Sequence, residues 1–282
     1  MFRSIFLSLV VVLLVSACGS DNSNSRTSTI TPGNDPNFAI VANADEGLKT
    51  FNRKVTVFGV DIYAVAKVED SKLLHAANVL AQYLDNNEDG VVDDQLVLDK
   101  MLENKAFLVM WSSENDLNID PPSDRIGQDL GNDETNPNYV ANGKTGRFDA
   151  TLEEVLHIIN NAGHAFAYPD AFGLNIGSDL ANAMDVARGG QFLSVPSSYP
   201  EMAWYSYDDE TCDYDDCQTI EYLYWALTSM LGGQETRLDE IGHEWKLNTR
   251  ELVEIKDTSI FELLTDPRYK MPTNLPDGTY RR

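Results

Sequence analysis

The strongest β-strand signal in the chain is residues 54–66, Lys-Val-Thr-Val-Phe-Gly-Val-Asp-Ile-Tyr-Ala-Val-Ala. β-Branched and aromatic residues dominate on both sides of Gly59, so this stretch predicts one or two strands. From Ser71 to Leu84 the apolar side chains return every three or four residues, which predicts a helix directly after the strands. The folded part therefore begins with a small β element that has a helix beside it.

The rest of the chain is dominated by helical patterns. The sequence predicts a helix over 95–102, a buried strand over 106–111 and a long loop region over 112–148, where Asn, Asp, Gly and Pro are frequent. Further helices are predicted over 151–163, from Ser178 to the Gly189-Gly190 pair, and over 219–231. This pattern predicts an α+β fold with a mainly helical C-terminal two-thirds and a small N-terminal β element.

The charge balance excludes one class of partner. The 282 residues contain 45 Asp and Glu against 21 Lys and Arg, a net charge of −24. A surface of this sign repels nucleic acid and anionic headgroups and attracts cations. Nucleic-acid binding is therefore not expected.

The first residues have the layout of an export signal. Arg3 supplies a positive charge, residues 5–15 form a short apolar stretch, and Val15-Ser16-Ala17-Cys18 ends it. The apolar stretch is shorter than the roughly 20 residues that a membrane span needs. The tetrapeptide resembles a bacterial lipobox, which implies cleavage before Cys18 and lipidation of that residue.

This resemblance sets the expected organisation and location. Residues 1–17 are expected to be the signal peptide, 18–37 a flexible polar tether and 38–282 a single globular domain. The membrane is then a partner through the N-terminal lipid, and the location is the bacterial cell envelope. Gly19 favours the outer membrane, on its periplasmic or surface face.

Two cysteines remain once Cys18 is assigned to lipid. Cys212 and Cys217 lie close together in the sequence, and in an oxidising compartment such a pair predicts a local disulfide. Two thiols alone would be an incomplete metal site. The expected role of the disulfide is to fix the chain that enters the helix at 219.

A calcium-type pattern lies between the helices predicted at 71–84 and 95–102. Side-chain oxygens at loop positions 1, 3 and 5, a Gly at 6 and a backbone carbonyl at 7 suit Ca²⁺. Those places are filled in order, with a carboxylate also at position 9, by Asp85, Asn87, Asp89, Gly90, Val91 and Asp93. The loop resembles those of EF-hand and dockerin proteins, and equally those of thrombospondin-type repeats.

Position 12 of this loop departs from the pattern, because Leu96 stands where a closing carboxylate belongs. Asp94 or Asp99 would have to replace it, so a weak structural calcium site is expected. The alternative is an acidic turn that binds no ion.

The predicted helix at 151–163 carries the best candidates for chemistry. Glu153 and His157 are spaced i,i+4, so both could reach one metal ion, and Asn160 and His164 continue the same polar stripe. The segment Glu153-Glu154-Val155-Leu156-His157 resembles the zincin metallopeptidase helix His-Glu-x-x-His, with a Glu in place of the first His. This resemblance implies that Glu154 is the general base and that His157 is a zinc ligand.

Further ligands follow from the same resemblance. In glutamate-type zincins a later helix supplies a third ligand, and Glu221 is the only charged residue of the apolar helix over 219–231. His164 would join the group only if the helix ended near Gly163. Two alternatives stay open: Thr151 and Glu154 match a capping box, and Glu221 suits an exposed first helical turn.

Three functions compete on this basis. The first is a membrane-anchored, extracytoplasmic, metal-dependent hydrolase, peptidase-like, acting on a peptide or polymer with zinc and an accessory calcium loop. The second is a non-catalytic, calcium-stabilised lipoprotein that binds a partner or polymer. The third is a di-metal oxidoreductase, because Glu240 and His243 repeat the Glu-x-x-His spacing.

Overall fold

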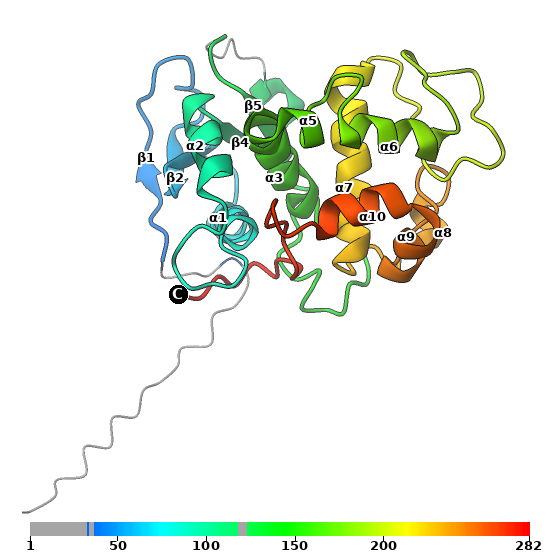
Figure 1. Cartoon of the computed structure of the whole chain (residues 1–282). Coiled ribbons are helices and arrows are strands. Elements are labelled where there is room, and N and C mark those ends of the chain that lie inside the picture. The colour runs from blue at the N-terminus through cyan, green and yellow to red at the C-terminus, as the bar shows by residue number, and fades with distance from the viewer. Residues whose placement is uncertain (1–32, 34–36, 118–122) are drawn as a thin grey trace, which may run out of the picture.

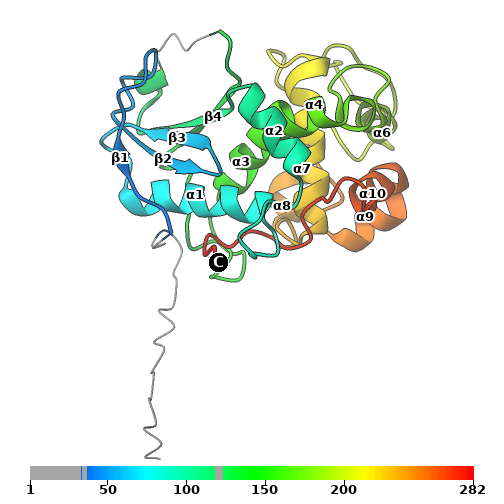
Figure 2. The same ribbon diagram turned by 60° about the vertical axis from the view of Figure 1, so that its left-hand side comes forward.

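The computed structural model describes residues 33, 37–117 and 123–282, and their arrangement is shown in Figures 1 and 2. The predicted signal peptide, Cys18 and the tether, apart from residues 33 and 37, lie outside the described residues. The strands gather on one side of the fold and most helices on the other (Figure 1). The predicted α+β class is confirmed.

Within the described residues, five strands form one mixed sheet in the order β1-β2-β3-β4-β5. β1 to β3 pair antiparallel, whereas β3, β4 and β5 pair parallel. The strands are β1 (Val41–Ala42), β2 (Arg53–Val57), β3 (Val60–Ala64), β4 (Phe107–Trp111) and β5 (Gly127–Gly131). β2 and β3 form a hairpin through Phe58 and Gly59, both with positive φ, as the tightest hairpin turns require.

Two helices, α1 (Asp70–Leu84) and α3 (Thr151–Ile159), pack on the sheet. α1 contacts β2 and β3, while α3 contacts β4 and β5 and also lies against α1. α1 is seen below the strands in Figure 2. Buried His75 on α1 pairs with buried Asp149, 2.6 Å apart, immediately before α3. The N-terminal end of α3 is thereby fixed to α1.

The helical part is built around α7 (Thr219–Met230), whose residues are buried except for Glu221. α7 packs on α3, and its other neighbours include α6, α9 and α10. Apart from two π-helical turns, the remaining helices in the described residues are α2 (Gln95–Glu103), η1 (Glu114–Leu117), α4 (Ala165–Ala167), α5 (Pro169–Phe172), α6 (Asp179–Arg188), α8 (Leu238–Ile241), α9 (Arg250–Lys256) and α10 (Thr258–Thr265). The contact between α3 and α7 joins the sheet to the helical part.

Most predicted elements occur close to their predicted bounds. Ser178 caps α6 by accepting the Ala181 N–H, and Gly189 ends that helix with φ of +76°. β5 was not predicted, since it lies inside the expected loop region. The helix predicted over 151–163 is present, but it is α-helical only as far as Ile159 and continues as a π-helical turn, η2 (Asn160–His164).

Gly163 explains the close packing of this turn. A Cβ added there would lie 2.7 Å from the Val97 side chain on α2. Only a glycine lets η2 approach α2 this closely.

In the described part of the chain, no helix combines the length and apolar character needed to cross a membrane.

Candidate metal centre

Three side chains from α3 and α7 meet in one place. One oxygen of Glu153, one ring nitrogen of His157 and one oxygen of Glu221 all lie within 4.8 Å of one another. Glu153 and His157 are one helical turn apart on α3, and Glu221 comes from the first turn of α7. Among residues 33, 37–117 and 123–282, this is the only Asp, Glu, His or Cys group of three that is close enough to share a metal ion.

His157 is the centre of the group and is only 5% exposed. Its Nδ1 lies 3.3 Å from Glu154 Oε2, and its Nε2 lies 3.6 Å from Glu221 Oε1. The second distance is too long for a hydrogen bond, and buried Nε2 has no hydrogen-bond partner. Leaving such an atom unpaired is unfavourable, and a metal ion between the carboxylates would satisfy it. The donors therefore fit a divalent cation.

The pKa values of the three side chains are all raised, which means that the site favours bound protons. Burial raises the pKa of Glu221 to about 7, although His157 opposes the shift, and burial with nearby Glu221 raises the pKa of Glu153 well above its ordinary value. Burial lowers the pKa of His157, but the charges of Glu221 and Glu154 outweigh it and raise that pKa to about 10. Without an ion, protons neutralise the site, and a metal ion would displace them.

Glu154 lies beside this group and does not form the capping box. Thr151 is already inside α3 and its buried hydroxyl has no hydrogen-bond partner, while Asp149 accepts the Thr151 N–H. The Glu154 carboxylate instead accepts a hydrogen bond from Gln128 on β5 and lies next to His157. Glu154 is thus held at the site by tertiary contacts.

Glu221 is not in an exposed first turn. Its side chain is 15% exposed, and a π-helical turn, η3 (Tyr214–Gln218), runs directly into α7, so α7 has no free N-terminal end. The predicted disulfide between Cys212 and Cys217 is present at the entry to η3, with the two Cα atoms 5.7 Å apart. π-Helical turns are frequent at functional sites, and here one follows His157 and another precedes Glu221.

His164 does not join the group. Its Nδ1 lies 3.0 Å from Asn160 Oδ1 and its ring lies 5.4 Å from that of Phe172. Burial lowers its pKa to about 4, so it is neutral at neutral pH. The continuation of the helix through η2 keeps His164 away from His157, as the spacing of an unbroken helix requires.

The second Glu-x-x-His pattern does not form a site either. Both oxygens of Glu240 pair with Arg237, and His243 is exposed. The structure therefore offers no support for a di-metal centre.

The calcium-type loop has the turn that its sequence predicts. Gly90 has φ of +88°, and Asp85, which is fully buried, accepts the N–H groups of Asp89 and Gly90 at 3.1 and 2.8 Å. Asn87 accepts the Asp89 N–H, and Asp89 accepts the Val91 N–H, both at 2.9 Å. These contacts within the loop hold its turn in place.

The closing carboxylate is not supplied by the candidates nearest in sequence. Asp94 caps α2 with one oxygen and accepts the Tyr168 hydroxyl with the other. Asp99 accepts from Gln95 on the exposed side of α2. Asp93, at position 9, accepts the backbone N–H of Asn86 at 2.7 Å.

The same loop docks the C-terminal segment. The side-chain oxygen of Asn86 accepts the N–H groups of Thr273 and Asn274, and Asp85 accepts the Tyr280 hydroxyl. A structural role therefore exists for the loop whether or not an ion binds.

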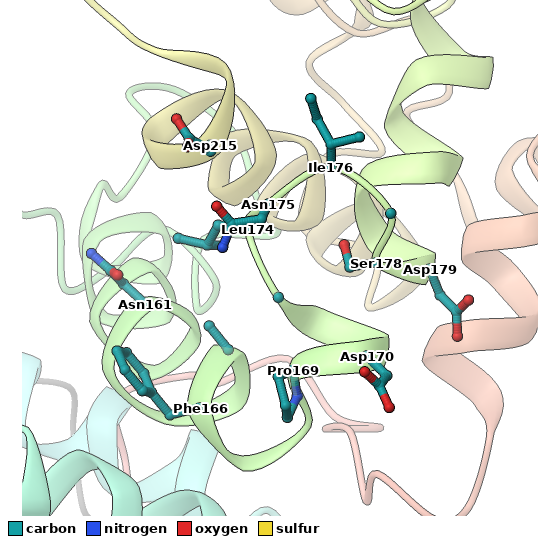
Figure 3. Close-up of a pocket in the computed structure, with 13 residues that line it drawn as sticks. Asn161, Phe166, Pro169, Asp170, Leu174, Asn175, Ile176, Ser178, Asp179 and Asp215 are labelled. Atoms are coloured by element: carbon teal, nitrogen blue, oxygen red, sulfur yellow. The ribbon is translucent and has the colours of Figure 1, made fainter.

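An open depression of about 890 Å³ lies beyond the end of α3 (Figure 3). Asn161 of η2 and Asp215 of η3 line it, together with Phe166 and Ile176, but none of the three convergent ligands does. Asn161 is one turn past His157, roughly 6 Å along a helix axis. The depression is thus a neighbour of the candidate metal centre and not its cavity.

Sequence patterns gave no signal for Gln128, because its strand has two glycines and no β-branched residue. Tyr224, whose ring lies edge-on to His157 at 5.6 Å, was also missed, although its i,i+3 spacing from Glu221 could have indicated it.

Comparison of the chain with protein-family models, curated proteins and solved structures finds no match.

Proposed function

We propose that this protein is a metal-dependent hydrolase, peptidase-like, held to the bacterial cell envelope by lipid on Cys18. The observation that carries the proposal is the convergence of Glu153, His157 and Glu221 around an unpartnered, buried imidazole nitrogen. One histidine and two carboxylates suit zinc, whose catalytic sites have three protein ligands and an open position. These three residues would hold the ion.

Glu154 supplies the acid–base chemistry in this proposal. A divalent ion held there would supply Lewis-acid polarisation of the scissile carbonyl. The Glu154 carboxylate, held by Gln128, accepts the proton of the attacking water and transfers it to the leaving amine. Its partly exposed side chain, 20% accessible, allows water to approach it.

The test separates binding of the ion from the chemical step. The mature domain is loaded with zinc and incubated with a mixture of unstructured peptides, whose cleavage is followed by mass spectrometry. Glu154→Gln is expected to keep zinc at the wild-type stoichiometry and to lose cleavage. Glu235→Gln, at an exposed site that pairs with Lys144, is the matched control and should cleave normally. Cleavage by Glu154→Gln at the wild-type rate would contradict the role of Glu154.

A second candidate function rests on a different observation. The calcium-type loop is ordered and anchors the C-terminal segment through Asn86 and Asp85. This favours a calcium-stabilised lipoprotein that binds a partner or polymer without catalysis. A wild-type domain that binds calcium but no zinc would select this alternative.

A further inference from the structure

The open depression beyond the end of α3 has a lining that is both acidic and apolar (Figure 3). Its carboxylates are those of Asp170, Asp179 and Asp215, all exposed to solvent, and no Lys or Arg is among the described residues that line it. Phe166 and Ile176 add apolar surface and are 48% and 54% exposed. The volume of about 890 Å³ falls within the range of ligand-binding sites, about 300–1,000 Å³.

The three carboxylates have no counter-ion of their own. Within residues 33, 37–117 and 123–282, none of them accepts a hydrogen bond or forms an ion pair. Arg268 is attracted by Asp179, but its guanidinium pairs with Asp266.

These carboxylates also lie apart from one another. Asp215 is across the depression from Asp170 and Asp179 in Figure 3, and the three do not form a group that could share a metal ion. Separated negative charges around an apolar floor are complementary to an extended ligand with separated positive charges, and not to a single cation. A peptide that contains several Lys or Arg residues has this chemistry.

The depression borders both helices that carry the candidate metal ligands. Asn161 lines it from η2 and follows His157 in the i,i+4 row that begins with Glu153. On the other side, the carbonyl oxygen of Leu174 lies 3.4 Å from the hydroxyl of Thr219, the first residue of α7. An extended chain spans about 3.3–3.6 Å per residue, so about two or three residues would lead from an ion at His157 to the depression.

We propose that this depression binds Lys and Arg side chains of the substrate, so that the hydrolase acts on basic peptides. The aliphatic stem of a lysine or an arginine packs on Phe166 and Ile176, while its charged end meets Asp170, Asp179 or Asp215. The inference rests on the proposed function and names its substrate class. Binding in the depression itself needs no metal ion.

The first measurement is peptide binding to the full mature chain in EDTA, which separates binding from metal-dependent cleavage. The probe is a short fluorescein-labelled peptide in which Lys alternates with Leu, Ser and Gly, followed by fluorescence anisotropy. The same peptide with every Lys acetylated keeps the stems and loses the charges. The wild-type chain should bind the Lys peptide about 10-fold more tightly, because acetylation removes several exposed ion pairs that are each weak.

Two sets of variants locate the binding. Asp170→Asn combined with Asp215→Asn removes two carboxylates with little change of size and should weaken binding of the Lys peptide by about 3- to 30-fold. The matched control is Asp239→Asn combined with Glu254→Gln, which changes the net charge equally at exposed positions outside the lining. It should bind as the wild type does. Phe166→Ala should weaken binding of both peptides, because it removes apolar surface.

The outcomes separate this inference from the proposed function. Equal affinity of the wild type for the Lys peptide and the acetylated peptide would overturn the inference. Equal weakening in the double variant and in its control would also overturn it, since the net charge of −24 alone would then attract the peptide.

Cleavage is measured separately on the zinc-loaded chain. Faster cleavage of the Lys peptide than of the acetylated peptide would support the substrate class. Cleavage of both at one rate would overturn the substrate class and leave the hydrolase standing. A chain that binds the Lys peptide in EDTA but cleaves neither peptide would overturn the hydrolase and leave the depression as a binding site for basic peptides.

Discussion

Replacing Glu221 by Gln is expected to stabilise the metal-free protein above pH 7, although it removes a candidate ligand. Burial raises the pKa of Glu221 from 4.5 to about 7 against the opposing effect of His157, and the side chain is 15% exposed. A pKa that is higher in the folded state means that the folded state holds the proton more tightly. The stability from this group is therefore present below pH 4.5 and is lost as the pH rises through 7.

The size of the effect follows from the shift. At about 1.4 kcal/mol per pH unit, a rise from 4.5 to about 7 corresponds to about 3 kcal/mol of lost stability at alkaline pH. Gln does not titrate, so the variant avoids this loss. The attraction to the His157 imidazolium is already contained in the pKa of about 7, and the partial exposure of the side chain lowers the expected net gain to about 1 to 3 kcal/mol at pH 8.5. Near pH 4 the two proteins should have equal stability.

Urea unfolding in EDTA at pH 4 and pH 8.5 measures this difference, provided that the urea dependence of the unfolding free energy stays the same. Glu254→Gln, at an exposed position on α9, is the control and should match the wild type at both pH values. A Glu221→Gln protein less stable than wild type at pH 8.5 would refute the reasoning. It would show that the ionised Glu221 carboxylate stabilises the metal-free protein through its ion pair with His157. The burial of this carboxylate would then need no metal ion to explain it.

Three further predictions concern other parts of the chain. Asp85→Ala should lower the unfolding free energy by about 2 to 4 kcal/mol even in EDTA, because buried N–H groups lose their acceptor. A larger loss of unfolding free energy in calcium than in EDTA would reveal ion binding, and equal losses would exclude it at this loop. Replacing Cys212 and Cys217 by Ser should cost about 2 kcal/mol, the value expected for so short a closed loop, in thermal denaturation; unchanged stability would contradict this. Cys18→Ala should leave the protein out of the membrane fraction, and a variant that still sediments with membranes would oppose the lipobox assignment.

The elements that could be predicted from sequence have strong local signals. Ser178 and Gly189 mark the ends of α6 through a side-chain cap and a left-handed residue, both properties of single residues. The run over 106–111 is apolar on both faces, as befits β4 between two parallel partners. The i,i+4 spacing of Glu153 and His157 likewise needs only a helix.

The features that escaped prediction depend on contacts between distant segments. β5 forms because the β4 backbone offers it hydrogen bonds, and its own residues have low strand propensity. Glu154 matched a capping box by local spacing, but packing against β5 gives its carboxylate to Gln128 instead. The approach of Glu221 to His157 was expected only by resemblance, since nothing in either helix alone specifies that α3 and α7 pack together.

The most direct test of the account is the zinc content of the mature domain, purified without chelators and analysed by mass spectrometry of the metal. His157→Ala is compared with His164→Ala, which changes a second buried histidine seven residues further along the chain and outside the group. The account predicts one transition-metal ion per chain in the wild type and in His164→Ala, and none in His157→Ala. A wild-type domain free of transition metal, or a His157→Ala domain that retains it, would contradict the assignment of Glu153, His157 and Glu221 as a metal centre.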